Sequence, residues 1–148
     1  MADLRELPLV DASVEEDETF ASAVAALFAA KVPAIAVVRA DRSLVGIVSE
    51  LDVLRALFPG YLSDLRHTAF LEDDPAALDD RANAVRGRPA GDFARSVDPL
   101  EGDDSVTHAA ERFLHAGEQA LPVVEGGRLL GMLSIAALCH GRLDAAET

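Results

Sequence analysis

The spacing of apolar residues between positions 19 and 57 predicts four consecutive elements. A stripe with the period of one helix face follows Thr19, a residue type that often caps helices. Residues 34–38 and 44–49 are short apolar runs rich in β-branched side chains, which predicts two buried strands. From Glu50 to about Leu57 the pattern returns to a helical period. The stripe after Thr19 consists of Phe20, Ala23, Val24, Leu27 and Phe28.

The same pattern occurs a second time near the end of the chain. Ser105 takes the place of Thr19, and residues 120–124 and 129–134 take the places of the two strands. The offset is 86 residues from the cap through the first strand and 85 after a turn that is one residue shorter. A register kept over so many positions indicates an internal repeat. Two units of this size are expected to pack together about a pseudo-twofold axis. The second stripe is Val106, Ala109, Ala110, Phe113 and Leu114.

We therefore predict an α+β fold in which each repeat is a small, mostly three-stranded sheet flanked by helices. The expected boundaries are 8–60 and 97–143, with a connecting segment at 61–96 that is too long for a plain loop. Apolar positions predict a helix from Pro75 to Arg86 and a helical turn from Tyr61 to Arg66. Basic residues gather only in this segment, where they form a solvated face or reach a bound phosphate: Arg81, Arg86, Arg88 and Arg95.

The junction at Ser49 is a candidate ligand site. A strand ends there and a helix begins, which leaves backbone N–H groups and a partial positive charge suited to an oxygen-rich ligand. Asp52, one turn further, can accept hydrogen bonds from a ribose. The same Ser-x-x-Asp pattern is also typical of a capping box that has only a structural role.

Each repeat resembles a CBS domain, the module named after cystathionine β-synthase, and the pair resembles a tandem CBS (Bateman) module. The matching stretches are residues 32–38 with 44–52, and 118–124 with 129–134. The resemblance implies β-α-β-β-α units that enclose two clefts for adenosine nucleotides, such as AMP, ADP, ATP or S-adenosylmethionine. The family's Gly-h-x-Ser/Thr-x-x-Asp motif maps onto Gly46, Ser49 and Asp52.

The resemblance also implies roles for other residues of the first cleft and a weaker second cleft. Val32 and Ala34 would lie against the adenine, and Thr19 near the phosphates. The second cleft would use Ser134, Ala120 and Ser105. Because Ala137 stands where the first repeat has Asp52, we expect one competent site.

Charge and composition exclude several classes of function. Twenty-six acidic and 13 basic residues give a formal charge of −13, which disfavours nucleic acid as a partner. No apolar run is long enough for a membrane span, and the start of the chain lacks the features of a signal peptide, so we expect a cytoplasmic protein. His108 and His115 lie seven residues apart and Cys139 is the only cysteine, so we expect no metal site. No acid, base and nucleophile assemble, so we expect neither an enzyme nor a required cofactor.

These observations predict a regulatory module that binds an adenosine nucleotide and signals to a protein effector, such as an enzyme or a transporter. The alternative is a ligand-free interaction or dimerisation domain with vestigial clefts. Retention of Ser49 and Asp52 favours the first interpretation, and Ala137 favours the second. We also expect a homodimer, because residues 51–57 and 135–140 are apolar over more surface than one sheet can cover, and such helices pair in the family.

Overall fold

The computed structural model describes residues 3–58 and 75–147, and the chain forms two units of the same topology. The first contains β1 (Ser13–Glu15), α1 (Phe20–Ala30), β2 (Ala34–Val38), β3 (Leu44–Ser49) and α2 (Glu50–Leu57). The second contains β4 (Leu100–Glu101), α4 (Val106–Ala116), β5 (Ala120–Glu125), β6 (Arg128–Ser134) and α5 (Ile135–Glu147). The predicted α+β fold with two β-α-β-β-α repeats is confirmed.

The segment between the repeats contains α3 (Pro75–Val85), where the sequence predicts a helix, and a short 3-10 turn at Ala90–Phe93. Another such turn, Leu4–Glu6, opens the described chain. The helical turn predicted at Tyr61–Arg66 lies outside the described residues. The domain boundaries 8–60, 61–96 and 97–143 remain predictions.

The two sheets have the same order and register. In each, a short first strand runs parallel to the central strand, which is antiparallel to the third: β1-β2-β3 and β4-β5-β6. Even the irregularity in the ladder recurs, between Val37 and Val38 in β2 and between Val123 and Val124 in β5. The repeat in the sequence therefore corresponds to a repeat in backbone geometry.

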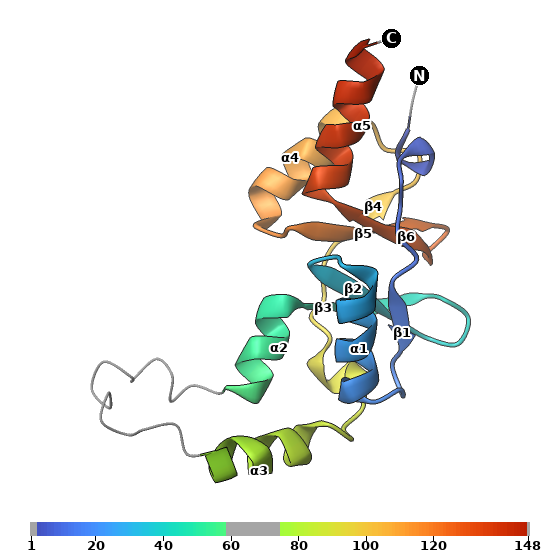
Figure 1. Cartoon of the computed structure of the whole chain (residues 1–148). Coiled ribbons are helices and arrows are strands. Elements are labelled where there is room, and N and C mark those ends of the chain that lie inside the picture. Colours follow the sequence, from blue (N-terminus) through green and yellow to red (C-terminus); the bar gives the residue numbers. More distant parts are fainter. Residues whose placement is uncertain (1–2, 59–74, 148) are drawn as a thin grey trace.

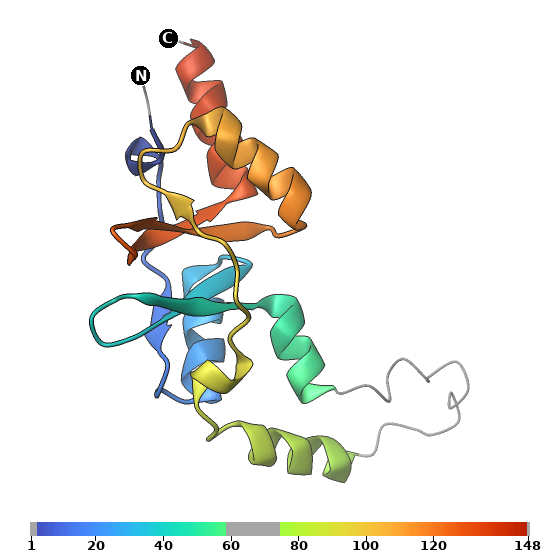
Figure 2. The same ribbon diagram turned by 180° about the vertical axis from the view of Figure 1, so that it is seen from behind.

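The molecule consists of helices, sheet, sheet and helices in four successive layers (Figure 1). Helices α1 and α2 lie on one side of the sheet pair, and α4 and α5 lie on the other, as the view from behind confirms (Figure 2). All five residues of β2 and the first five of β5 are buried. One apolar cluster joins the sheets, because Ala120, Leu129 and Met132 of the second repeat pack among core residues of the first.

The segment that leads into each repeat first crosses the edge strand of the other repeat. Arg95 pairs with Ile47 of β3 through two backbone hydrogen bonds of 2.8 and 2.9 Å. Val10 pairs in the same way with Met132 of β6, through bonds of 2.7 and 3.0 Å. Arg95 and Val10 are therefore structurally equivalent residues.

Gly46 makes the approach of the Arg95 segment possible. A Cβ atom at this position would lie 2.5 Å from the backbone oxygen of Arg95. We expect Gly46→Ala to displace that segment and lower the free energy of unfolding by about 1–3 kcal/mol, measured by urea denaturation. Gly87→Ala is the matched control, because no atom beyond Gly87 itself and its two chain neighbours lies within 4 Å of the place that its methyl group would take. Equal losses in the two variants would contradict this account.

Candidate functional site

A cavity of about 640 Å³ lies between the two repeats, at the ends of β2 and β3. This volume falls within the range of about 300–1,000 Å³ that is usual for small-molecule sites. Both repeats line it: the first supplies Pro33, Ala34, Ser49, Glu50, Leu51, Leu54 and Arg55, the connecting segment Arg95, and the second repeat Gly117, Glu118 and Gln119.

Ser49 lies at the wall of this cavity as the N-cap of α2. Its hydroxyl accepts a hydrogen bond of 3.1 Å from the backbone N–H of Asp52. The Asp52 carboxylate accepts from the Ser49 backbone N–H at 2.9 Å and from the Ser49 hydroxyl at 2.8 Å. The capping box, one of the two interpretations of this sequence pattern, is thus present.

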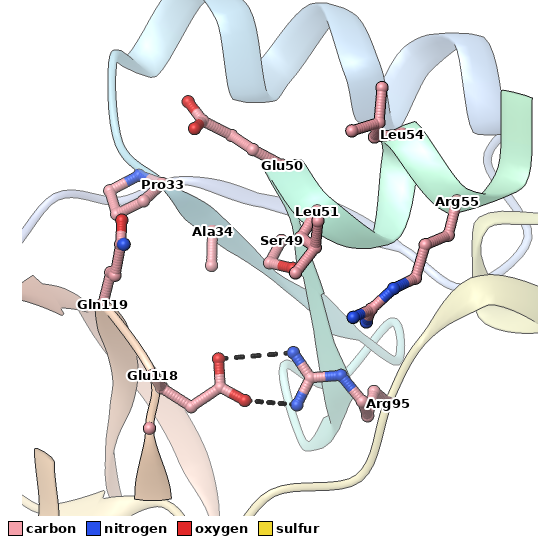
Figure 3. A pocket seen from close by; sticks show the side chains of 11 residues that line it. Pro33, Ala34, Ser49, Glu50, Leu51, Leu54, Arg55, Arg95, Glu118 and Gln119 are labelled. Atoms are coloured by element: carbon pink, nitrogen blue, oxygen red, sulfur yellow. Dashed lines mark hydrogen bonds and ion pairs between the residues drawn. The ribbon is translucent and has the colours of Figure 1, made fainter. Parts of the chain in front are cut away.

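Arg95 joins the two repeats across the cavity. Its Nε donates to Asp52 Oδ1 at 3.3 Å and its Nη2 to Asp52 Oδ2 at 3.2 Å. On the opposite side, Nη2 donates to Glu118 Oε2 at 3.3 Å, and Nη1 donates to Glu118 Oε1. Figure 3 shows this second pair of bonds. Asp52 belongs to α2 and Glu118 to the turn between α4 and β5, so one guanidinium binds a carboxylate of each repeat.

These side chains are partly withdrawn from water, which strengthens their interactions. The side chains of Asp52 and Glu118 are 14% and 13% exposed, and that of Arg95 is 39% exposed. Burial by itself would raise the pKa of Asp52, but the hydrogen bonds from Arg95 and Ser49 outweigh it and hold this pKa below its usual value. The bonds to Glu118 and then Asp52 raise the pKa of Arg95.

Two further charged side chains line the cavity. Arg55 extends from α2 toward the side on which Arg95 lies, whereas the carboxylate of Glu50 points away from Arg95 (Figure 3). Within residues 3–58 and 75–147, Arg55 forms no ion pair. Among these residues, the site therefore combines one paired and one unpaired guanidinium with apolar walls from Ala34, Leu51 and Leu54.

The other residues expected at the first cleft lie in different places. Ala34 lines the cavity, whereas Val32 is packed in the core and Gly46 lies under the Arg95 backbone. Thr19 caps the N-terminus of α1, whose other end leads to Pro33. Since α1 has 11 residues, Thr19 lies about 16 Å from that end. The structure thus places Ser49 and Ala34 at the cavity, with Asp52 bonded to Ser49 but not among the lining residues, and it leaves Thr19 apart from them.

The residues expected at the second cleft have structural contacts. Ser134 accepts a hydrogen bond of 3.0 Å from the backbone N–H of Ala137, and Ser105 caps α4 by accepting from His108. Ala120 is fully buried in the shared core. None of these three lines the cavity described above.

A comparison of equivalent positions in the two repeats shows how the two clefts differ. The equivalents of Asp52, Arg95 and Glu118 are Ala137, Val10 and Val32, all of them apolar. The first cleft therefore contains an arginine paired with two carboxylates, whereas the second has apolar residues at the equivalent positions. The sequence expectation of unequal clefts rested on Ala137 alone, and the structure adds two further differences at the same place.

Sequence reasoning missed Glu118 and Arg55 and left Arg95 undecided among four arginines. Of the others, Arg81 donates to the carbonyl of Ala56, and Arg88 stacks on Phe93 and pairs with Asp92. Arg86 lines a smaller apolar hollow between α1, α2 and α3. One signal was available: Glu118 lies 86 residues after Val32, so a charged residue of the second repeat occupies the place of an apolar residue of the first.

Comparison with known proteins settles the family. The sequence pattern of the CBS domain matches residues 4–59 and 90–143. The chain belongs to the CBS domain family. Together the two matches make it a tandem CBS pair. No protein among the curated sequences matches the chain.

Solved structures of other CBS proteins have the same fold. A CBS domain-containing protein of unknown function from Kribbella flavida is 20% identical, with a TM-score of 0.77 and coverage of 97% of this chain and 99% of that one. The CBS domain of a membrane protein from Sphaerobacter thermophilus is 22% identical, with a TM-score of 0.72 and coverage of 95% and 87%. CBSX2 in complex with AMP is 23% identical, with a TM-score of 0.64 and coverage of 99% and 94%.

Among the described residues, the structure contains neither a metal-ligand cluster nor a membrane-spanning helix. No group of three or more His, Cys, Asp or Glu side chains is arranged to hold a metal ion within residues 3–58 and 75–147. Over the same part of the chain, no helix has the length and apolar character needed to cross a bilayer.

The lowered pKa of Asp52 predicts a specific dependence of stability on pH. Because this carboxyl binds its proton less readily in the folded chain, its contribution is fully present above about pH 4 and is lost as the pH falls through the folded pKa. We expect Asp52→Asn to lower the free energy of unfolding by about 1–3 kcal/mol at neutral pH. This difference should shrink below about pH 4. Urea denaturation over a pH series measures this difference in the free energy of unfolding. Asp103→Asn, at an exposed position, is the control. A difference that does not change with pH would contradict the prediction.

Proposed function

We propose that this CBS pair is a regulatory module that binds one adenosine nucleotide in the cavity between its repeats. The observation that carries the proposal is the cavity itself, where Ser49, the start of α2 and two arginines meet an apolar wall. The complex of CBSX2 with AMP supports it, because that protein has the same fold and binds a ligand of this class.

The lining residues suit the parts of such a ligand. Apolar Ala34, Leu51 and Leu54 offer a surface for a base, and Arg55 offers a cation for a phosphate. Asp52 has the acceptor oxygens that ribose hydroxyls require, but Arg95 holds them in the structure described here. Binding of the ribose would thus compete with Arg95.

This competition gives the ligand a route to a change of shape. Arg95 holds a carboxylate of each repeat, so a ligand that takes over Asp52 alters the link between them. A ligand shifts a conformational equilibrium only by its differential affinity for the two states. A ligand that replaces Arg95 at Asp52 binds more tightly to the state in which this link is broken. A protein effector can detect the change of state.

The pseudosymmetric serines provide a matched test of the binding site. Ligand at about 100 times its Kd stabilises a protein by roughly 2.7 kcal/mol, which is on the order of 5–10 °C in Tm for 148 residues. We expect Ser49→Ala and Ser134→Ala each to lose about 1 kcal/mol of cap energy. Only Ser49→Ala should also lose most of the Tm shift caused by AMP.

A thermal-shift screen with adenosine, AMP, ADP, ATP and S-adenosylmethionine measures this difference. A shift in the wild type that Ser49→Ala retains in full would place the ligand elsewhere. If no adenosine ligand shifts the wild type, the ligand-free interaction domain becomes the better account.

We further propose that the chain forms a homodimer through the helix layers. Leu51 and Leu54 of α2 are 50% and 48% exposed, and Ile135 and Leu143 of α5 are also exposed. Phe28 of α1 and Leu114 of α4, which are equivalent in the two repeats, are each 85% exposed. Large apolar side chains exposed on helices of both repeats are typical of a protein interface.

We expect sedimentation velocity at micromolar concentration to find a dimer in the wild type and a monomer in Leu54→Glu. The introduced charge would have to be buried at the interface without a partner. Ala40→Glu, which places the same charge on the exposed turn between β2 and β3, should remain dimeric. A monomeric wild type would overturn the proposal.

A further inference from the structure

We infer that Glu118 limits the ligand of this cavity to adenosine compounds with no more than one phosphate. The inference rests on the proposed function and concerns the choice among its ligands. It begins from the charges at the site: among the described residues, Glu50, Glu118, Arg55 and Arg95 line the cavity, and Asp52 pairs with Arg95.

The two arginines are not equally available to a phosphate. Arg95 is bonded on one side to Asp52 and on the other to Glu118, and both carboxylates are largely buried. Arg55 has no ion-pair partner among the described residues. It belongs to the last turn of α2, and its side chain lines the same cavity as Ser49 at the start of that helix. A first phosphate therefore has one free cation and the positive end of α2.

A second or third phosphate has no such partner. It would extend along the cavity toward Arg95, whose guanidinium is still neutralised by Glu118 after the ribose has taken Asp52. To bind Arg95 it must displace Glu118 and leave that carboxylate partly buried beside a growing negative charge. Two negative charges placed side by side in a partly buried site repel each other strongly. The affinity should thus fall with each added phosphate.

Pseudosymmetry isolates Glu118 as the deciding residue. Its counterpart in the other cleft is Val32, which is buried and uncharged. Both residues follow a left-handed helix cap, Gly117 after α4 and Lys31 after α1, so the backbone requires neither side chain. The carboxylate is a feature of this cavity rather than of the fold.

Calorimetric titration of the full chain with adenosine, AMP, ADP and ATP, in the presence of a chelator, tests the inference. In the wild type we expect AMP to bind at least about tenfold more tightly than ATP, which corresponds to about 1.4 kcal/mol. Glu118→Gln keeps an oxygen for Arg95 and removes the charge, so it should tighten ATP at least fivefold and change adenosine less than twofold. Glu111→Gln, which removes a charge from an exposed position of α4 that does not line the cavity, should leave the ratio of ATP to AMP affinity unchanged within twofold.

The outcomes separate this inference from the proposed function. If neither protein binds any adenosine ligand, the proposed function fails. If the wild type binds ATP as tightly as AMP, or if Glu118→Gln tightens adenosine and ATP equally, the function stands and the inference is overturned. Should Glu118→Gln not fold, the wild type alone decides. Raising NaCl from about 0.05 to about 0.5 M must then increase the ratio of ATP to AMP affinity, because salt screens the repulsion. If the ratio of ATP to AMP affinity stays constant or falls as salt is added, the inference is overturned.

Discussion

Each three-stranded sheet has two apolar faces, and its own helices can cover only one of them. The central strands β2 and β5 are buried along almost their whole length, so the second face of each sheet has to lie against protein. The other repeat supplies that cover, and a single apolar cluster runs between the sheets. Neither repeat could bury this surface alone. The position of the cavity, bounded by both repeats, follows from the same packing.

Packing of the sheets also forces the leading segments to cross. The chain reaches each repeat by pairing first with the edge strand of the other, at Ile47 and at Met132. This exchange delivers Arg95 to the first repeat and Val10 to the second. The symmetry of the backbone is close, yet the chemistry at the equivalent places is opposite. One cleft holds an arginine between two carboxylates, and the equivalent positions of the other are Val10, Ala137 and Val32.

A partly buried ion pair of this kind is a poor source of stability, because desolvation offsets much of the attraction. Apolar residues at these positions would stabilise the fold equally well, and the second cleft has apolar residues at the equivalent positions. The charged residues at the first cleft therefore make better sense as groups that exchange partners when a ligand enters. Their link between the repeats is what such an exchange would change.

The sequence by itself determined the repeat, the order of helices and strands, and the helix caps at Thr19 and Ser105. These features depend on local periodicity and on hydrogen bonds over three residues, which a linear pattern contains. It also indicated unequal clefts, through Ala137 in place of Asp52. The tertiary structure alone decided which of four arginines reaches the cavity, that Glu118 opposes it, and that Thr19 lies at the far end of α1. Asp52, Arg95 and Glu118 are separated by 43 and 23 residues along the chain. Only the packing of one sheet on the other brings them within reach, so no local pattern in the sequence predicts their contact.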